Sequence, residues 1–132
     1  MIRIAVCDDE NVIVNQIEHI ISEVCKRESI PVNIDVFYSG RELKRQVTSG
    51  TKYDIIFLDI QMKGGDGITA AENIRKVDDN VLLIYVSGYD KYMMELFRLD
   101  VFGFIKKPID EEILTKTFLE TYQRAVSYTH LT

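Results

Sequence analysis

YDIIFL, at residues 53–58, is apolar almost throughout and is followed directly by an aspartate, Asp59. A second run of this kind, VLLIYV, occupies residues 81–86 and is followed by Ser87. Such runs are typical of strands covered on both faces, as the central strands of a parallel sheet are. We therefore predict two buried strands, each of which ends at a polar side chain.

Short runs like these alternate with stretches of helical period, which is typical of a parallel sheet covered by helices. The other predicted strands are Ile2–Cys7, Val32–Phe37 and Gly103–Ile105. The first predicted helix carries an apolar stripe of Ile13, Ile17, Ile20, Ile21 and Val24, and the others span residues 40–47, 68–76, 91–99 and 110–124. Ser39 and Glu42 form an expected capping box, and Asp110 can cap the last helix. The sequence thus predicts an α/β fold of five strands and five helices.

Length limits the domain organisation. A chain of 132 residues has room for one domain with a substantial core and for no second domain. The helical pattern is lost after residue 126. We therefore assign residues 1–126 to the domain and treat residues 127–132 as a frayed end, the start of a linker or residues added in cloning.

Composition excludes several classes of protein. The formal net charge is −5, and the acidic residues are scattered, so no nucleic-acid-binding surface is expected. No apolar stretch approaches the ~20 residues that span a bilayer, and the N-terminus lacks the features of a signal peptide. Cys7 and Cys25 have no CxxC spacing, and we interpret both as buried thiols in a reducing compartment. We expect a cytoplasmic protein without membrane contact.

Four of the predicted strands place a reactive side chain just beyond their last residue. Asp8 and Asp9 follow the first strand, Asp59 the third, Ser87 the fourth and Lys107 the fifth. In open α/β sheets, ligands bind beyond the carboxyl ends of the strands, where loops and helix N-termini converge. The sequence therefore predicts a single site at this edge of the sheet.

The residue types at this edge indicate phosphoryl transfer. Three neighbouring carboxylates repel one another, so a divalent cation is expected between them, and an all-oxygen ligand set favours Mg²⁺. Lys107 would supply a second positive charge, and Ser87 a hydrogen bond. A nucleophilic carboxylate with positive charge around the phosphoryl oxygens is what such a reaction needs. Each residue alone is more commonly a turn former or a helix cap, and only their joint placement favours the chemistry.

Five segments, in this order and spacing, closely resemble the receiver domains of two-component response regulators, from Ile2 to about Arg124. They are CDDE at residues 7–10, LDIQM at 58–62, GDG at 65–67, VSG at 86–88 and FIKKP at 104–108. The resemblance implies a flavodoxin-like (CheY-like) three-layer α/β/α fold with strand order 2-1-3-4-5. It further implies a phosphorylation switch rather than an enzyme, which a sensor histidine kinase phosphorylates and which catalyses its own phosphorylation and dephosphorylation.

The same resemblance implies roles for the residues that surround the site. Asp59 is the implied phosphoacceptor, and Asp9 and Asp59 are the implied direct ligands of Mg²⁺. Gln61 would contribute its backbone carbonyl, and Asp8 a weaker or water-mediated contact. Lys107 would hold the phosphoryl group, and the Lys107–Pro108 bond is expected to be cis, although only about 5 to 6% of such bonds are.

The resemblance also implies a switch. The hydroxyl of Ser87 would turn toward the phosphoryl group, and the ring of Phe104 would swing inward. The side chains of Gln61 and Tyr89 would set the rate of acylphosphate hydrolysis. The face formed by the fourth helix, fifth strand and fifth helix, with apolar residues between Tyr92 and Phe102, could then pair with a second copy or an output domain.

A narrower resemblance is to receivers of the LytR/AgrA family, which precede a LytTR-type DNA-binding domain. It depends on DIQM at residues 59–62, AAENIR at 70–75, Tyr89, Tyr92 and LF at 96–97. It implies a transcription factor whose output domain lies beyond this chain. One departure is KGG at residues 63–65, where the family commonly begins the loop with proline.

Three alternatives remain open. A phosphatase of the haloacid-dehalogenase type also uses an Asp nucleophile, but it needs a second Asp at the position of Gln61. A flavodoxin-like nucleotide or flavin binder would need a Gly-rich first loop, which here is acidic. A degenerate receiver that acts only in dimerisation would not need the full set of acceptor-site residues.

Overall fold

The structure is a computed structural model, and it describes residues 1–62, 66–88 and 100–131. Five parallel strands form one sheet of order β2-β1-β3-β4-β5, as expected. The strands are β1 (Ile2–Cys7), β2 (Val32–Phe37), β3 (Ile55–Leu58), β4 (Leu82–Ser87) and β5 (Gly103–Lys106). The helices of the described ranges are α1 (Asn11–Arg27), α2 (Gly40–Thr48), α3 (Asp66–Val77) and α5 (Glu111–Leu131). The helix expected over residues 91–99 lies outside those ranges.

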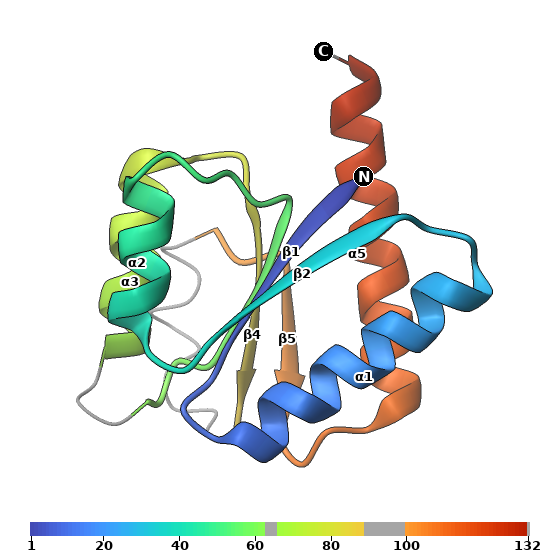
Figure 1. The fold of residues 1–132 in the computed structure, drawn as a ribbon, viewed down its shortest axis with the longest axis horizontal. Helices are drawn as coiled ribbons and strands as arrows, with labels where there is room; N and C mark the ends of the chain where they lie inside the picture. Colours follow the sequence, from blue (N-terminus) through green and yellow to red (C-terminus); the bar gives the residue numbers. More distant parts are fainter. Residues whose placement is uncertain (63–65, 89–99, 132) are drawn as a thin grey trace.

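The helices cover both faces of the sheet, which confirms the three-layer arrangement. Figure 1 shows α2 and α3 on one side and α1 and α5 on the other. The arrowheads of β4 and β5 lie at the edge of the sheet where α1 begins. The carboxyl ends of the strands therefore meet near the N-terminus of α1.

Several element boundaries differ from the prediction by one or more residues, and two of these differences have a structural cause. Strand β3 begins at Ile55 rather than Tyr53, because the carboxylate of Asp54 accepts the backbone N–H of Arg3 at 2.8 Å, where a strand would offer a carbonyl. Helix α5 continues to Leu131 rather than ending near Arg124, since residues 125–131 contain no glycine or proline to stop it.

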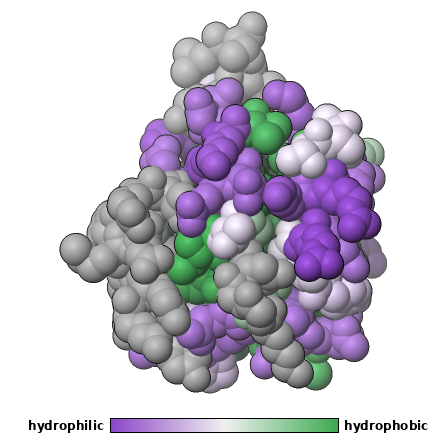
Figure 2. Space-filling model, turned by 90° about the vertical axis from the view of Figure 1, so that its left-hand side faces the viewer, coloured by the Kyte–Doolittle hydropathy of each residue, from purple (hydrophilic) through white to green (hydrophobic). Residues whose placement is uncertain are grey.

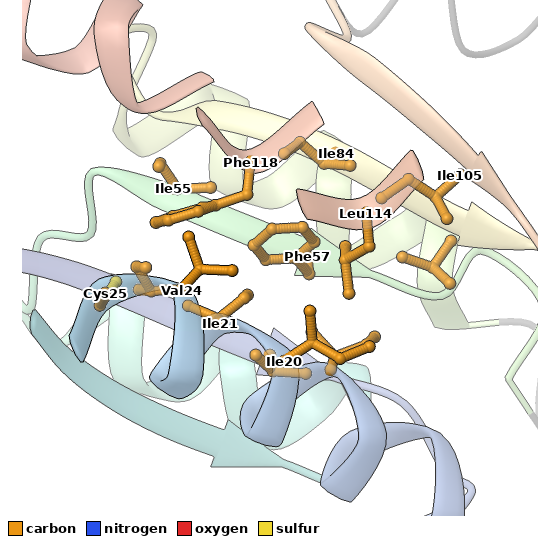
Figure 3. Packing of buried hydrophobic residues seen from close by; sticks show 14 of the residues in the cluster. Ile20, Ile21, Val24, Cys25, Ile55, Phe57, Ile84, Ile105, Leu114 and Phe118 are labelled. Carbon is orange, nitrogen blue, oxygen red and sulfur yellow. The ribbon is translucent and has the colours of Figure 1, made fainter. Parts of the chain in front are cut away.

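The larger hydrophobic core lies between the sheet and helices α1 and α5. The buried stripe of α1 includes Ile17, Ile20, Ile21 and Val24, as predicted, and also Val14 and Cys25, whereas the predicted Ile13 is only half-buried against it. Figure 3 shows the labelled side chains of α1, from Ile20 to Cys25, facing residues of the sheet and of α5, which include Phe57, Ile84, Ile105, Leu114 and Phe118. Cys25 thus belongs to the core, and burial raises the pKa of its thiol to about 11, so it is not a reactive thiolate.

A second core lies on the opposite face, under α2 and α3. It contains Cys7, Leu58 and Tyr85 from the strands, together with Leu43 and Ile74 from the helices. The two clusters bury the central strands β1, β3 and β4 on both sides, as their apolar sequences predict. The reactive residues that follow these strands are therefore carried by rigid, fully covered elements.

The N-terminus of α2 is capped as the sequence predicts. The hydroxyl of Ser39 accepts a hydrogen bond from the backbone N–H of Glu42 at 3.2 Å. We expect Ser39→Ala to lower the free energy of unfolding by about 1 kcal/mol, because the N–H loses its partner. Urea denaturation would measure this, with Ser49→Ala at the other end of α2 as the control, and an unchanged midpoint would contradict it.

One face of the molecule is mainly polar among its described residues (Figure 2). Figure 2 shows a face on which hydrophilic side chains predominate around a small hydrophobic area. Among the described helices, none combines the length and the apolar character needed to cross a bilayer.

Candidate functional site

The three predicted carboxylates lie together beyond the ends of β1 and β3. Asp8 and Asp9 follow β1, and Asp59 follows β3. One carboxylate oxygen from each lies within 4.8 Å of the others. Asp8 and Asp59 are buried, with 1% and 2% of their surface exposed, whereas Asp9 is half-buried. The acidic cluster is thus open to solvent on the side of Asp9.

Lys107 brings a positive charge to this cluster from β5. Its Nζ lies 2.9 Å from Oδ2 of Asp8 and 3.5 Å from Oδ2 of Asp59. Its backbone N–H donates to the carbonyl of Ser87 at 3.0 Å, and the Lys107–Pro108 bond is cis, as expected. Lysine and carboxylates therefore come from three different strands.

Backbone N–H groups orient the two buried carboxylates. The N–H of Glu10 donates to Oδ1 of Asp8 at 2.9 Å, and that of Gln61 donates to Oδ1 of Asp59 at 2.9 Å. In both residues, Oδ1 accepts the backbone N–H and Oδ2 faces Nζ of Lys107. The N–H of Asp59 donates to the carbonyl of Cys7 at 2.9 Å, which fixes the acidic residue to the end of β1.

The electrostatics of the site leave negative charge poorly compensated. Burial raises the pKa of Asp59 to about 6, and the charges of Asp8 and Asp9 add to the rise against the opposing effects of the Gln61 N–H and Lys107. Burial also raises the pKa of Asp8. For Lys107, burial would lower the pKa, but its contact with Asp8 and the charge of Asp59 outweigh this and raise it. One lysine thus does not neutralise the three carboxylates.

The remaining predicted site residues are placed as follows. Ser87 is fully buried at the end of β4, and Gln61 is half-buried two residues after Asp59. Phe104 is half-buried in β5, opposite Tyr85, and packs against the second core. Tyr89 and the KGG departure at residues 63–65 lie outside the described residues. These positions do not test the roles expected for the Ser87 hydroxyl, the Phe104 ring and the Gln61 carbonyl, which stay predictions.

One residue at the site has no role in the sequence prediction. Gly67, the second residue of α3, lies against the backbone of Asp59 and Ile60. The sequence signal for it is the GDG segment at residues 65–67, which carries the family resemblance. A glycine inside the first turn of a helix is itself an indication of a close backbone approach.

Comparisons with known proteins agree with this geometry. The family model of the response regulator receiver domain matches residues 4–119. The chain is similar to Sensory transduction protein LytT of Bacillus anthracis, with 28% identity over 124 residues that cover 94% of this chain and 48% of that protein. It is similar to Sensory transduction protein LytR of Staphylococcus haemolyticus, with 28% identity over 107 residues that cover 81% and 40%. The chain thus spans about half the length of the curated relatives it matches.

Solved structures share the fold. The response regulatory domain of protein mrkE from Klebsiella pneumoniae matches with a TM-score of 0.84 at 20% identity, covering 96% of this chain and 99% of that one. A two-component response regulator from Clostridium difficile matches with a TM-score of 0.79 at 23% identity, covering 94% and 98%. With the family match over most of its length and LytT and LytR among its relatives, the chain belongs to the receiver domains of two-component response regulators.

Proposed function

We propose that this receiver domain takes a phosphoryl group onto a carboxylate oxygen of Asp59, with a histidine kinase as the donor and Mg²⁺ as the required cofactor. The observation that carries the proposal is the joint placement of Asp8, Asp9 and Asp59 within 4.8 Å of one another, with Lys107 against two of them. The pattern is that of a phosphoryl-transfer site, in which charge stabilisation and positioning supply most of the catalysis.

The donor set fits Mg²⁺. All three candidate side-chain ligands are carboxylates, and burial raises the pKa of Asp8 and of Asp59, so a cation between them would favour their ionised forms. Asp9 and Asp59 would hold the ion directly, with the Gln61 carbonyl, and Asp8 more weakly. When bound, Mg²⁺ supplies positive charge that keeps the carboxylates ionised and neutralises phosphoryl oxygens.

The chain's own residues account for the transfer step. An ionised oxygen of Asp59 attacks phosphorus, and a new O–P bond forms while the bond from phosphorus to the donor's imidazole nitrogen breaks. The bonding electrons stay with the imidazole, which takes up a proton. The Gln61 N–H holds the other Asp59 oxygen at 2.9 Å, and the Lys107 ammonium faces the charge that builds on the phosphoryl oxygens.

The family and the relatives support a proposal for what phosphorylation changes in this domain. Ser87 and Phe104 would change position on phosphorylation and alter the face that includes β5 and α5, where a second copy could bind. Gln61 and Tyr89 would set the lifetime of the phosphoryl group. In the intact protein, a LytTR-type DNA-binding domain would follow the receiver, which we place at residues 1–126, with residues 127–132 outside it, and the domain itself would bind no nucleic acid.

Labelling with acetyl phosphate tests the proposal. We expect intact-mass spectrometry to find one added phosphoryl group with Mg²⁺, and none with EDTA. Asp59→Asn should abolish the addition because it removes the nucleophilic oxygen. Asp54→Asn, which changes a carboxylate at the other end of β3, is the matched control and should be labelled like the wild type.

The family match argues against the phosphatase and the flavodoxin-like binder, and the same experiment tests the third alternative, a degenerate receiver. A receiver that acts only as a dimerisation module would show no added mass under any condition. Equal labelling of wild type and Asp59→Asn would contradict the assignment of the acceptor.

A further inference from the structure

Helix α3 begins in direct contact with the backbone of Asp59. A Cβ atom at Gly67 would lie 2.4 Å from the carbonyl oxygen of Asp59 and 2.6 Å from Cα of Ile60. Ordinary van der Waals contact begins at 3.4 Å, so a methyl group at this position falls 1.0 Å short of the space it needs. The obstructing atoms are backbone, which cannot turn aside as the end of a flexible side chain can. The first turn of α3 can therefore lie here only with glycine at residue 67.

The side chains on the buried face of α3 become larger with distance from this contact. Gly67, Ala70, Ala71 and Ile74 follow one another at three- and four-residue spacing and are all buried. Residues at this spacing share one face of a helix. The smallest of them, Gly67, is at the N-terminal end, where it meets the backbone of Asp59 and Ile60.

Neither side of the contact is free to move away. The N–H of Asp59 is bonded to the carbonyl of Cys7 at 2.9 Å, and Ile60 is 3% exposed within the second core. On the helix, Ala71 and Ile74 are 0% and 1% exposed in the same core. Close-packed interiors transmit a local shift rather than absorb it. A displacement at residue 67 is therefore passed on to residues 59 and 60.

We infer that Gly67 is a positioning residue: it lets the first turn of α3 hold the backbone of Asp59 and thereby sets where its carboxylate lies relative to Asp9 and Lys107. The inference rests on the proposed function, since it concerns the reactivity of Asp59. A misplacement of about 1 Å can slow a positioned reaction by about 100-fold. We therefore expect Gly67→Ala to lower the rate constant of phosphorylation by acetyl phosphate by about tenfold or more.

The test compares Gly67→Ala with Gly103→Ala in the full chain at saturating Mg²⁺. A Cβ at Gly103 would be 3.3 Å from Cγ2 of Thr117, so this control also adds a tight methyl group, but against a side chain. Its phosphorylation rate should stay within about twofold of the wild type. Amide NMR spectra of the unphosphorylated proteins supply a second readout, in which the Asp59 and Gln61 signals shift in Gly67→Ala and stay in place in Gly103→Ala.

The outcomes are distinguishable. If the wild type is not labelled at all, the proposed function fails. If the wild type is labelled and Gly67→Ala reacts at the same rate with unshifted Asp59 and Gln61 amides, the positioning role is overturned. If circular dichroism shows that Gly67→Ala does not fold, Ala70→Val is measured instead, because it crowds the same face of α3 one turn later. A slower phosphorylation rate with shifted Asp59 and Gln61 amides supports the inference. An unchanged rate overturns it.

Discussion

Asp59→Asn is expected to raise the free energy of unfolding of the Mg²⁺-free protein at pH 7.5 by about 2 to 3 kcal/mol. The carboxyl group is buried, and its pKa in the folded protein is about 6, above the ordinary value of 3.8. A difference of about two pKa units corresponds to roughly 3 kcal/mol between the two protonation states. Asparagine is nearly isosteric, carries no charge at pH 7.5 and keeps an oxygen for the Gln61 N–H.

The sign of the pH dependence follows from the direction of the shift. Because the folded pKa is the higher one, the folded protein binds the Asp59 proton more tightly than the unfolded chain does. The stabilisation by this proton is complete below about pH 4 and is lost as the pH rises through about 6. The advantage of Asp59→Asn should therefore grow over this window and then stay constant.

Urea denaturation between pH 4 and 8 in EDTA would measure this difference. Asp79→Asn, at an exposed aspartate, is the matched control and should change stability by less than about 0.5 kcal/mol. If Asp59→Asn is less stable than the wild type at pH 7.5, nearby groups balance the negative charge of the buried carboxylate. That result would contradict the electrostatic account of the site.

Lys107→Met is expected to have an effect of similar size and opposite sign. Lys107 is the cation between the buried carboxylates of Asp8 and Asp59, at 2.9 and 3.5 Å. Methionine keeps the length of the side chain but removes its charge, and leaving buried charge without its partner costs about 3 kcal/mol or more. We expect a loss of about this size at pH 7.5 in EDTA, and a phosphorylation rate lower by about tenfold or more.

Two controls separate charge from packing. Lys52→Met, at an exposed lysine outside the site, should leave stability almost unchanged. The loss in Lys107→Met should shrink toward pH 4, because Asp59, with a pKa of about 6, takes up a proton, and it should shrink in combination with Asp59→Asn. A loss that is the same at pH 4 and pH 7.5 would mean that the side chain acts by packing alone.

Much of the site could be predicted because strand ends determine which residues meet. The apolar run at residues 53–58 predicts a covered strand, and a parallel sheet gathers the residues that follow its strands at one edge. Asp8, Asp9, Asp59 and Lys107 are brought together in this way. The strand order itself came from the family resemblance, since periodicity does not say which strands are neighbours.

What could not be predicted depends on contacts distant in the chain. The start of β3 changes because the Asp54 side chain bonds to Arg3, which is 51 residues away. The closer approach of Lys107 to Asp8 than to Asp59 is a matter of side-chain conformation. The close packing of Gly67 on Asp59 requires knowing how α3 lies on the sheet. Sequence patterns report faces and strand ends, but not these distances.

The central claim is that Asp59 accepts the phosphoryl group, and chemical trapping tests it most directly. The wild type is incubated with acetyl phosphate and Mg²⁺ and then reduced with borohydride, which converts an aspartyl phosphate into homoserine. Peptide sequencing by mass spectrometry should find homoserine at residue 59 and unchanged aspartate at residues 8 and 9. Homoserine at residue 8 or 9, or none in a protein that has gained the phosphoryl mass, would contradict the account.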